Sequence, residues 1–293
     1  MQQAVCRLLR GRSCLYTIKG ETDLAVFKVN IKSQALYAGT TVNVILPLPG
    51  SGDYNAGKAE ELILKDGEKY AVLYLLHGMY GDSTNWIRSS NIERYAARHR
   101  IAVVMPEGYN SFYNDIPYGS AYFTYLTKEL PRMMQSLFPI SAKREYNYIA
   151  GLSMGGFGAA KAALSCPDQY AASISLSGSM RELNPEKRPV NDENRWFTEC
   201  YGVGGKYFDP QTQNLKIMLK NLMDTGADIP RLYVACGTED FLYDANVEFR
   251  DFCAEIGYPL KYEEGPGVHD WVFWDHYIQR GLDWIGLPGK FVD

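Results

Sequence analysis

The sequence has 293 residues, of which 46% are hydrophobic and 22% are charged. This balance is typical of a globular protein and excludes a disordered chain, and no uncharged apolar run approaches the roughly 20 residues of a membrane-spanning helix. Lys and Arg together number 30 and Asp and Glu 34, a formal net charge of −4 without a long run of one sign. Nucleic-acid binders carry a basic patch, so we expect neither nucleic acid nor a membrane as a partner.

The six cysteines are scattered, and none forms a C-x-x-C pair or lies near a histidine. That distribution argues against a zinc site and against a disulfide scaffold, which needs dense cysteines in a short chain. We therefore expect free thiols in a reducing, cytoplasmic compartment, with neither a metal ion nor a cofactor. The cysteines are Cys6, Cys14, Cys166, Cys200, Cys236 and Cys253.

The first residues carry three arginines, Arg7, Arg10 and Arg12, and only short apolar stretches. A secretory signal peptide needs about 7–15 consecutive apolar residues, so we do not expect one here. Because no acidic residue precedes Glu21, a transit peptide stays open as an alternative. We interpret residues 1–24 as a dispensable N-terminal extension and residues 25–293 as a single domain.

Two segments near the start of this domain, Ala25 to Ile31 and Thr41 to Leu46, alternate apolar and polar residues. Such alternation is typical of half-buried antiparallel strands. Five later segments are short, continuous apolar runs, which are typical of parallel strands covered on both faces. These runs are Ala71 to Leu76, Ile101 to Met105, Tyr146 to Ala150, Ala171 to Leu176 and Leu232 to Cys236.

Helical patterns lie between these strands. The last of them places Trp271, Trp274, Ile278, Leu282 and Ile285 on one stripe, at spacings of three and four residues. Alternating strands and helices predict an α/β fold, with an open, mostly parallel sheet and helices on both faces. The other helices are expected at Asn91 to Arg98, Ala121 to Leu137, Met154 to Leu164 and Asp240 to Glu255.

The segment from Ser179 to Asp228 contains no convincing strand and is far longer than the usual connection of about 2–6 residues. It has the pattern of short helices at Asp192 to Cys200 and Gln211 to Met223. We expect it to form a short helical cap over the carboxyl ends of the strands. An insertion that only shields the sheet is the alternative.

Gly151-Leu152-Ser153-Met154-Gly155 fits G-x-S-x-G, the pattern of a nucleophile elbow. The pentapeptide alone is a weak signal, but here it follows a predicted strand and precedes a helix rich in small residues. Its glycines allow a sharp turn and a close approach of strand and helix backbones. We predict Ser153 as a nucleophile; a glycine–serine turn without chemistry is the alternative.

A serine nucleophile needs a general base, and the sequence has four histidines. His99 ends a predicted surface helix between two arginines, where a solvated role is expected, and His276 lies inside the last helix as a packed or surface residue. His77 lies in a glycine turn after a strand, where we expect a structural anchor. His269 ends a loop just ahead of the final helix and is therefore the predicted base.

The base needs an orienting carboxylate, and Glu239, Asp240 and Asp244 compete for this role after the strand that ends at Cys236. We predict Asp240, because it comes where the strand has ended and its short side chain holds an imidazole tightly. A helix N-cap is its alternative role. The order Ser153, Asp240, His269 is that of α/β-hydrolases.

An oxyanion hole would complete the set. The residue after the nucleophile supplies one backbone N–H, here Met154, and the turn after an earlier strand supplies the second. In the turn from His77 to Gly81, Met79 is the candidate.

At these residues the sequence resembles the putative esterase family, which contains esterase D (S-formylglutathione hydrolase), the mycolyltransferase antigens and the bacterial tributyrin esterases. The resemblance runs from about Ala25 to the C-terminus and is strongest to the tributyrin esterases. The esterase D branch carries histidines beside the elbow, where this chain has Leu152 and Phe157. The matching motifs are Leu75-Leu76-His77-Gly78-Met79, Gly151-Leu152-Ser153-Met154-Gly155-Gly156, Gly237-Thr238-Glu239-Asp240 and Gly267-Val268-His269-Asp270-Trp271.

The resemblance implies an α/β-hydrolase fold and a serine carboxylesterase that cleaves short-chain acyl esters, including acetyl or feruloyl esters of sugars. Acyl transfer to a sugar hydroxyl and S-formylglutathione hydrolysis are the enzymatic alternatives. A binding protein that has lost its chemistry is a third, which the intact Ser153, Asp240 and His269 argue against. The expected partner is a small-molecule ester, and assembly into a homo-oligomer stays open.

Aromatic residues near these motifs are candidates for contact with substrate. They are Trp86 after the turn at His77, Tyr113 in the segment Asn110 to Asp115, and Trp271 two residues beyond His269. In the cap, Trp196 and Phe197 are expected to crowd the acyl pocket and so to favour short acyl groups.

Overall fold

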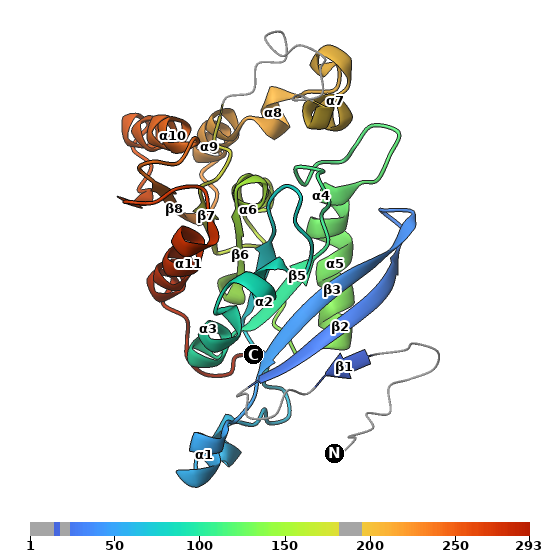
Figure 1. Cartoon of the computed structure of the whole chain (residues 1–293), viewed down its shortest axis with the longest axis vertical. Coiled ribbons are helices and arrows are strands. Elements are labelled where there is room, and N and C mark those ends of the chain that lie inside the picture. The colour runs from blue at the N-terminus through green and yellow to red at the C-terminus, as the bar shows by residue number, and fades with distance from the viewer. Residues whose placement is uncertain (1–14, 18–23, 182–194) are drawn as a thin grey trace.

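A nine-stranded sheet runs through the described part of the molecule (Figure 1). The computed structural model describes residues 15–17, 24–181 and 195–293. The strands lie in the order β1-β2-β3-β5-β4-β6-β7-β8-β9. They are β1 Leu15–Thr17, β2 Leu24–Ser33, β3 Ala38–Pro47, β4 Val72–Leu76, β5 Ala102–Pro106, β6 Asn147–Leu152, β7 Ala172–Leu176, β8 Arg231–Gly237 and β9 Lys261–Gly265.

The sheet is antiparallel at one edge and parallel elsewhere. β1, β2 and β3 pair antiparallel, as do β3 and β5, whereas every pair from β5 through β4 to β9 is parallel. The two predicted antiparallel strands and the five predicted parallel strands are therefore confirmed. β9 was not predicted, because its sequence, KYEEG, is charged and this edge strand lacks an apolar run.

Part of the predicted extension belongs to the sheet. Leu15–Thr17 pairs with residues 26–28 of β2, while residues 1–14 and 18–23, which include Cys6, Cys14 and the three arginines, lie outside the described residues. That residues 1–24 are dispensable stays a prediction.

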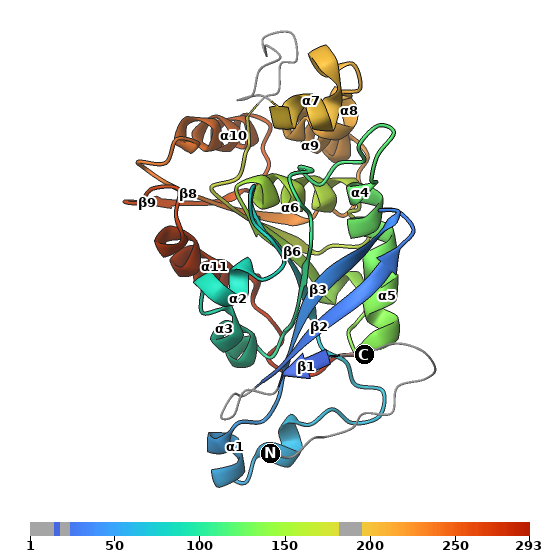
Figure 2. The ribbon, with the colours of Figure 1, turned by 45° about the vertical axis from the view of Figure 1, so that its right-hand side comes forward.

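Helices cover both faces of the sheet (Figure 2). In β4, Val72, Tyr74 and Leu76 join the core under α5, α6, α9 and α10, whereas Leu73 and Leu75 join the core under α3 and α11. Burial on both faces explains the continuous apolar runs. The helices are α1 Ser51–Asn55, α2 Asn85–Ser89, α3 Ile92–His99, α4 Tyr122–Thr124, α5 Leu130–Leu137, α6 Met154–Ser165, α7 Arg195–Tyr201, α8 Pro210–Gln213, α9 Leu215–Asp224, α10 Tyr243–Glu255 and α11 Trp271–Ile285.

The helix predicted from Ala121 to Leu137 contains α4, a π-helical segment at Tyr125–Glu129, and α5. The structure also contains the other four predicted helices, with ends shifted by a few residues. Within the described ranges, no helix combines the length and the apolar character needed to cross a membrane.

The predicted cap contains α7, α8 and α9, and residues 182–194 of it lie outside the described residues. Its α7 contacts the loop that follows β5: the Trp196 ring stacks on Phe112 at 4.2 Å between centroids, and Asn114 Nδ2 donates to the Tyr201 hydroxyl over 3.0 Å. Because that loop continues from the carboxyl end of β5, the cap lies at the predicted end of the sheet.

Candidate active site

Ser153 occupies a sharp turn between β6 and α6, with a φ of +54° and a ψ of −119°. Such a φ is unfavourable for a residue with a side chain and persists where the surroundings enforce it. The neighbouring glycines are required by space, since a Cβ on Gly151 would lie 2.3 Å from the Gly155 oxygen, and a Cβ on Gly155 would lie 2.6 Å from the His77 oxygen. The predicted close approach of strand and helix is confirmed.

Three loops bring Ser153, His269 and Asp240 into one hydrogen-bonded row. His269 Nε2 lies 3.0 Å from Ser153 Oγ, and His269 Nδ1 lies 2.8 Å from Asp240 Oδ2. Asp240 follows β8, and His269 lies between β9 and α11. These two loops are tightly packed, because a Cβ on Gly237 would lie 2.2 Å from the Gly267 oxygen.

The Asp240 side chain is fully buried. Burial raises the pKa of its carboxyl, but hydrogen bonds from His269, from the Leu242 N–H and from Ser177 outweigh that effect, so the pKa is lowered. Asp240 Oδ1 accepts the Leu242 N–H over 2.8 Å just ahead of α10. This oxygen therefore supports the start of the helix, which is the alternative role that the sequence suggested for Asp240. Asp240 therefore stays ionised beside the imidazole.

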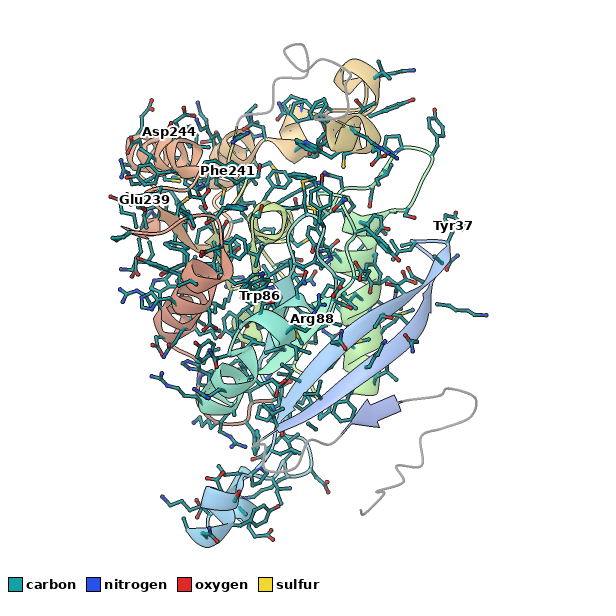
Figure 3. All side chains as sticks on the ribbon, in the orientation of Figure 1. Tyr37, Trp86, Arg88, Glu239, Phe241 and Asp244 are labelled. Atoms are coloured by element: carbon teal, nitrogen blue, oxygen red, sulfur yellow. The ribbon has the colours of Figure 1, made fainter. Side chains whose placement is uncertain are left out.

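The competing carboxylates have other surroundings (Figure 3). Glu239 Oε2 accepts the Gly267 N–H over 2.6 Å and thereby ties the two loops together. Asp244 is exposed on α10. The structure brings only Asp240, of the three, to the imidazole of His269.

The remaining histidines lie away from this row. His276 is exposed on α11, as expected. The solvated role expected of His99 is wrong: its side chain is only 13% exposed and lies 3.2 Å from Asp283 Oδ1, because α3 packs against α11. Burial lowers the pKa of His99, although the Asp283 charge opposes this.

His77 is buried and anchors its turn, as predicted. Its Nδ1 lies 2.7 Å from the Gly78 oxygen, and its Nε2 accepts the Gly108 N–H over 2.9 Å. Because a trans peptide directs its C=O and N–H oppositely, the bond to Gly78 O directs the Met79 N–H away from His77.

The turn that contains Met79 lies against Ser153. A Cβ on Gly78 would be 3.3 Å from Ser153 Cβ, so the glycine lets the turn lie close to Ser153 without crowding. Among the described residues, the backbone N–H groups of Met79 and Met154 donate no hydrogen bond. Unpaired backbone N–H groups close to a serine are the kind of donor that an oxyanion hole requires.

Two of the predicted substrate contacts are corrected by the structure. Trp86 is 1% exposed and its Nε1 donates to the Leu76 oxygen over 3.0 Å. Tyr113 is 2% exposed and its hydroxyl donates to the His77 oxygen over 3.1 Å. Both side chains support the turn at His77 from inside the core, and neither presents surface to a substrate.

Trp271 is half-buried and lies in a row of aromatic rings beside the base. Its ring is 5.1 Å from Trp86 and 5.3 Å from Trp274, and Trp274 meets the His269 ring edge-on at 5.0 Å. From the sequence, Trp274 was expected only in a core stripe, and Phe241, an exposed ring 4.5 Å from His269, was not predicted at the site. The position of Phe241 next to Asp240 in the chain was an available signal.

Comparisons with known proteins identify the family of this chain. The model of the family described as "Putative esterase" matches residues 33–285. The chain belongs to this family. An acetyl esterase of Caldicellulosiruptor saccharolyticus is 30% identical over 270 residues, which cover 89% of this chain and 98% of that protein.

Two solved structures from Staphylococcus aureus share the α/β-hydrolase fold of this putative esterase family member. The fluorophosphonate-binding serine hydrolase FphF superposes with a TM-score of 0.77, and the S-formylglutathione hydrolase FrmB with 0.75. Each is 32% identical, and each comparison covers 89% of this chain and 98% of the other. The chain is therefore a serine esterase.

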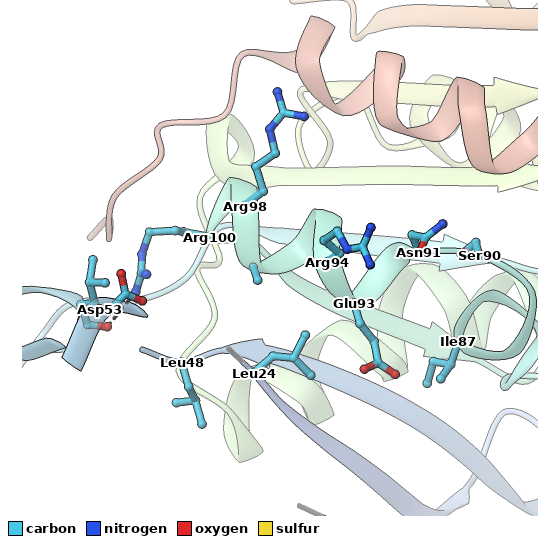
Figure 4. Close-up of a pocket in the computed structure, with 12 residues that line it drawn as sticks. Leu24, Leu48, Asp53, Ile87, Ser90, Asn91, Glu93, Arg94, Arg98 and Arg100 are labelled. Carbon is cyan, nitrogen blue, oxygen red and sulfur yellow. Dashed lines mark hydrogen bonds between the residues drawn. The ribbon is translucent and has the colours of Figure 1, made fainter. Parts of the chain in front are cut away.

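A separate hollow of about 800 Å³ lies between α3 and the segment after β3, away from the triad (Figure 4). Arg98 pairs with Asp283 there, and Arg100 donates to the Leu62 oxygen over 2.7 Å. With Asp53 and Glu93 also in its lining, this hollow has mixed charge, and its lining includes none of Ser153, His269 and Asp240.

Proposed function

We propose that Ser153, His269 and Asp240 act as nucleophile, general base and orienting carboxylate of a carboxylesterase that hydrolyses short-chain acyl esters. The observation that carries the proposal is the row of contacts at 3.0 Å and 2.8 Å that joins the three side chains. His269 Nε2 takes the Ser153 proton as Oγ attacks the ester carbonyl, and returns it to the departing alcohol. Water then attacks the acyl-enzyme with the same base and releases the acid.

The negative oxygen of the tetrahedral intermediate is held by the Met79 and Met154 N–H groups in this proposal. Preorganised backbone donors stabilise such a charge without rearranging during the reaction. The support is the contact of Gly78 with Ser153 and the direction that His77 gives to the peptide between Gly78 and Met79.

The preference for short acyl groups is supported by the similarity to an acetyl esterase and by the aromatic row beside His269. Trp271 is the proposed contact with the acyl group, since it is the half-buried member of that row. Trp196 and Phe197 pack on the loop after β5 and on α7 itself, and their contact with substrate stays a prediction. Each added methylene contributes about 0.8 kcal/mol only while the pocket has room.

A panel of p-nitrophenyl esters tests both parts of the proposal. We expect kcat/KM to be highest for acetyl to butyryl esters and to fall steeply by octanoyl, with Trp271→Ala moving the optimum to longer chains. Ser153→Ala should lose activity by several orders of magnitude and lose labelling by a fluorophosphonate, while Ser173→Ala, a buried serine of β7, keeps both. An optimum at decanoyl or longer would refute the short-pocket part, and residual turnover above a few per cent in Ser153→Ala would refute the nucleophile.

Hydrolysis of S-formylglutathione is a second candidate, favoured by the 32% identity to FrmB. It uses the same triad on a thioester, so it differs in the leaving group. The assay is the ratio of kcat/KM for S-formylglutathione to that for p-nitrophenyl acetate. A ratio far above one would replace the carboxylesterase proposal with the thioesterase.

A further inference from the structure

The turn that carries Met79 has a backbone conformation that suits glycine at a position occupied by tyrosine. The Gly81 N–H donates to the Gly78 oxygen over 3.2 Å and closes a four-residue β-turn. Tyr80, the third residue, has a φ of +61°, whereas the φ of Met79 is not positive. This is the φ pattern of a type II turn, in which the third residue is usually glycine. The side chain of Tyr80 therefore strains the backbone of this turn.

The strained conformation is held through the backbone, because the Tyr80 side chain is 89% exposed. The Tyr80 N–H donates to Asn110 Oδ1 over 2.8 Å. A backbone N–H can only donate, so the Asn110 amide presents its oxygen here. The relaxed alternative, a type I turn, differs by a flip of the peptide between Met79 and Tyr80, which would direct this N–H away from Asn110. Asn110 thus stabilises the strained form of the turn over the relaxed form.

Both peptides that flank Met79 are held by side chains. The peptide before it is fixed through the Gly78 oxygen, which lies 2.7 Å from His77 Nδ1. The peptide after it is fixed through the N–H that Asn110 accepts. The loop after β5, which carries Asn110, also reaches the first of these side chains, because the Gly108 N–H donates to His77 Nε2 over 2.9 Å. One loop therefore supports the turn on both sides of Met79.

We propose that Asn110 is a positioning residue of the oxyanion hole: its amide oxygen holds the peptide between Met79 and Tyr80 in the orientation that the hole requires. This inference rests on the proposed function, because it assigns a role at the same site. A flip of this peptide would exchange the sides of the Met79 C=O and the Tyr80 N–H, two opposite dipoles next to the proposed donor. Such donors stabilise the oxyanion because they need not rearrange during the reaction. Asn110 acts through the turn and not on the substrate.

Replacing Asn110 by alanine removes the acceptor. Loss of a whole oxyanion donor costs about 10²–10³-fold in kcat, and a donor that is misplaced part of the time should cost less. We expect Asn110→Ala to lower kcat about tenfold with KM nearly unchanged, because the affected interaction is made only in the transition state. Asn110→Leu also lacks the acceptor and keeps the volume. It carries the test if the melting temperature shows that Asn110→Ala does not fold.

Asn30→Ala is the matched control. The Asn30 amide oxygen also accepts a hydrogen bond near the surface, from Thr41 Oγ1 over 2.8 Å. This bond joins β2 and β3 at the antiparallel edge, away from Ser153. We expect Asn30→Ala to keep the kcat of the wild type.

Substitutions at Tyr80 test whether Asn110 acts against backbone strain. Tyr80→Gly relieves the strain at a φ of +61° and lets the turn keep its form unaided, whereas Tyr80→Ala removes only the ring. Removal of the Asn110 acceptor should therefore cost little kcat in Tyr80→Gly and about tenfold in Tyr80→Ala. Each Tyr80 variant is the reference for its own double variant, so any contact of the ring with substrate cancels.

A thionoester distinguishes the oxyanion hole from a general loosening of the site. Its carbonyl sulfur is a weaker acceptor than oxygen, so it gains little from the hole. The ratio of kcat/KM for p-nitrophenyl acetate to that for its thionoester should fall about tenfold in Asn110→Ala and stay at the wild-type value in Asn30→Ala. A loosening that disturbs the triad would slow both substrates equally.

A wild-type kcat in folded Asn110→Ala would overturn the inference. An unchanged ratio of ester to thionoester would do so too, as would equal losses in the Tyr80→Gly and Tyr80→Ala backgrounds. Failure of the proposed function has a different signature, namely turnover or fluorophosphonate labelling in Ser153→Ala. If Ser153→Ala is inactive and unlabelled while Asn110→Ala equals the wild type, only the role of Asn110 fails.

Discussion

Two buried ionisable residues, Asp240 after β8 and Lys161 on α6, differ in how well their surroundings stabilise the charged form. Asp240 faces donors from three directions, so its pKa is lowered despite burial. Lys161 donates to Asn114 Oδ1 and lies over the Phe123 ring, 4.5 Å from its centroid. Burial lowers the pKa of Lys161 to about 8, and the charge of Asp115 offsets this only in part.

The contrast shows that burial alone does not decide the state of an ionisable group. Donors converge on the carboxylate and favour its charged form, whereas an amide oxygen and an aromatic face compensate an ammonium incompletely. Asp240 is therefore suited to a charge that persists through a reaction. Lys161 instead joins α6 to the loop after β5, and through Asn114 to Tyr201 of the cap.

The largest expected effect is that of replacing Asp240, the proposed orienting carboxylate. Asp240→Asn should lower kcat/KM by about 10³–10⁴-fold, because an amide does not stabilise the imidazolium and can hold the wrong tautomer. Glu239→Gln and Asp244→Asn are matched controls from the same segment and should lose less than about tenfold. Steady-state kinetics on p-nitrophenyl acetate decide this, and a greater loss at either control would reassign the acid.

Lys161→Met tests the other side of the comparison through stability. The folded-state pKa of about 8 lies below the ordinary lysine value of 10.5, so between these values the unfolded chain binds more protons and stability rises with pH. This rise should amount to about 3 kcal/mol in the wild type and be absent from Lys161→Met. Urea unfolding of both proteins from pH 7.5 to 10.5 measures the difference, in which tyrosine titrations common to both cancel. Parallel curves of unfolding free energy against pH would show that folding does not shift the pKa of Lys161.

Tyr201→Phe tests the link from this lysine to the cap with a smaller change. It removes the hydroxyl that accepts from Asn114 Nδ2 over 3.0 Å and should lower the free energy of unfolding by about 1 kcal/mol. Because Tyr201 lies away from the catalytic row, kcat for p-nitrophenyl acetate should stay at the wild-type value. A kcat loss without a stability loss would mean that this network acts on the triad.

Removal of residues 1–22 should have the smallest effect. The described part of that segment, β1, pairs three residues with β2, whereas β2 pairs ten residues with β3. We expect kcat to be unchanged and the melting temperature to stay within about 2 °C. A larger drop of the melting temperature, measured by calorimetry, would show that the N-terminal residues stabilise the antiparallel edge of the sheet, as the cap contacts stabilise its other end.

The sequence predicted the parts of the molecule that depend on local pattern. The apolar runs of the parallel strands and the glycines around Ser153 are signals of this kind, because burial on both faces and backbone contact leave few alternatives at those positions. The order of Ser153, Asp240 and His269 then identified the residues that the structure brings together.

What the sequence did not predict depends on contacts between distant segments. Trp86 and Tyr113 lie near the site motifs in the chain, yet their rings point into the core, and nothing in their neighbours signals that direction. Ser177 gave no signal because its hydroxyl accepts from the indole of Trp274, which lies 97 residues away in the chain. The charged edge strand β9 was not predicted, because it is held by backbone pairing with β8 and not by burial of its side chains.

The tryptophans beside the base give the protein an internal optical reporter. Trp86, Trp271 and Trp274 are three of the five tryptophans in the chain, and each ring lies within 5.3 Å of the next, with the last against His269. Indole emission responds to a nearby charge, so a proton arriving on the imidazole or an acyl group arriving on Ser153 would alter the fluorescence of the unlabelled enzyme. Stopped-flow fluorescence could therefore follow acylation and deacylation with colourless esters.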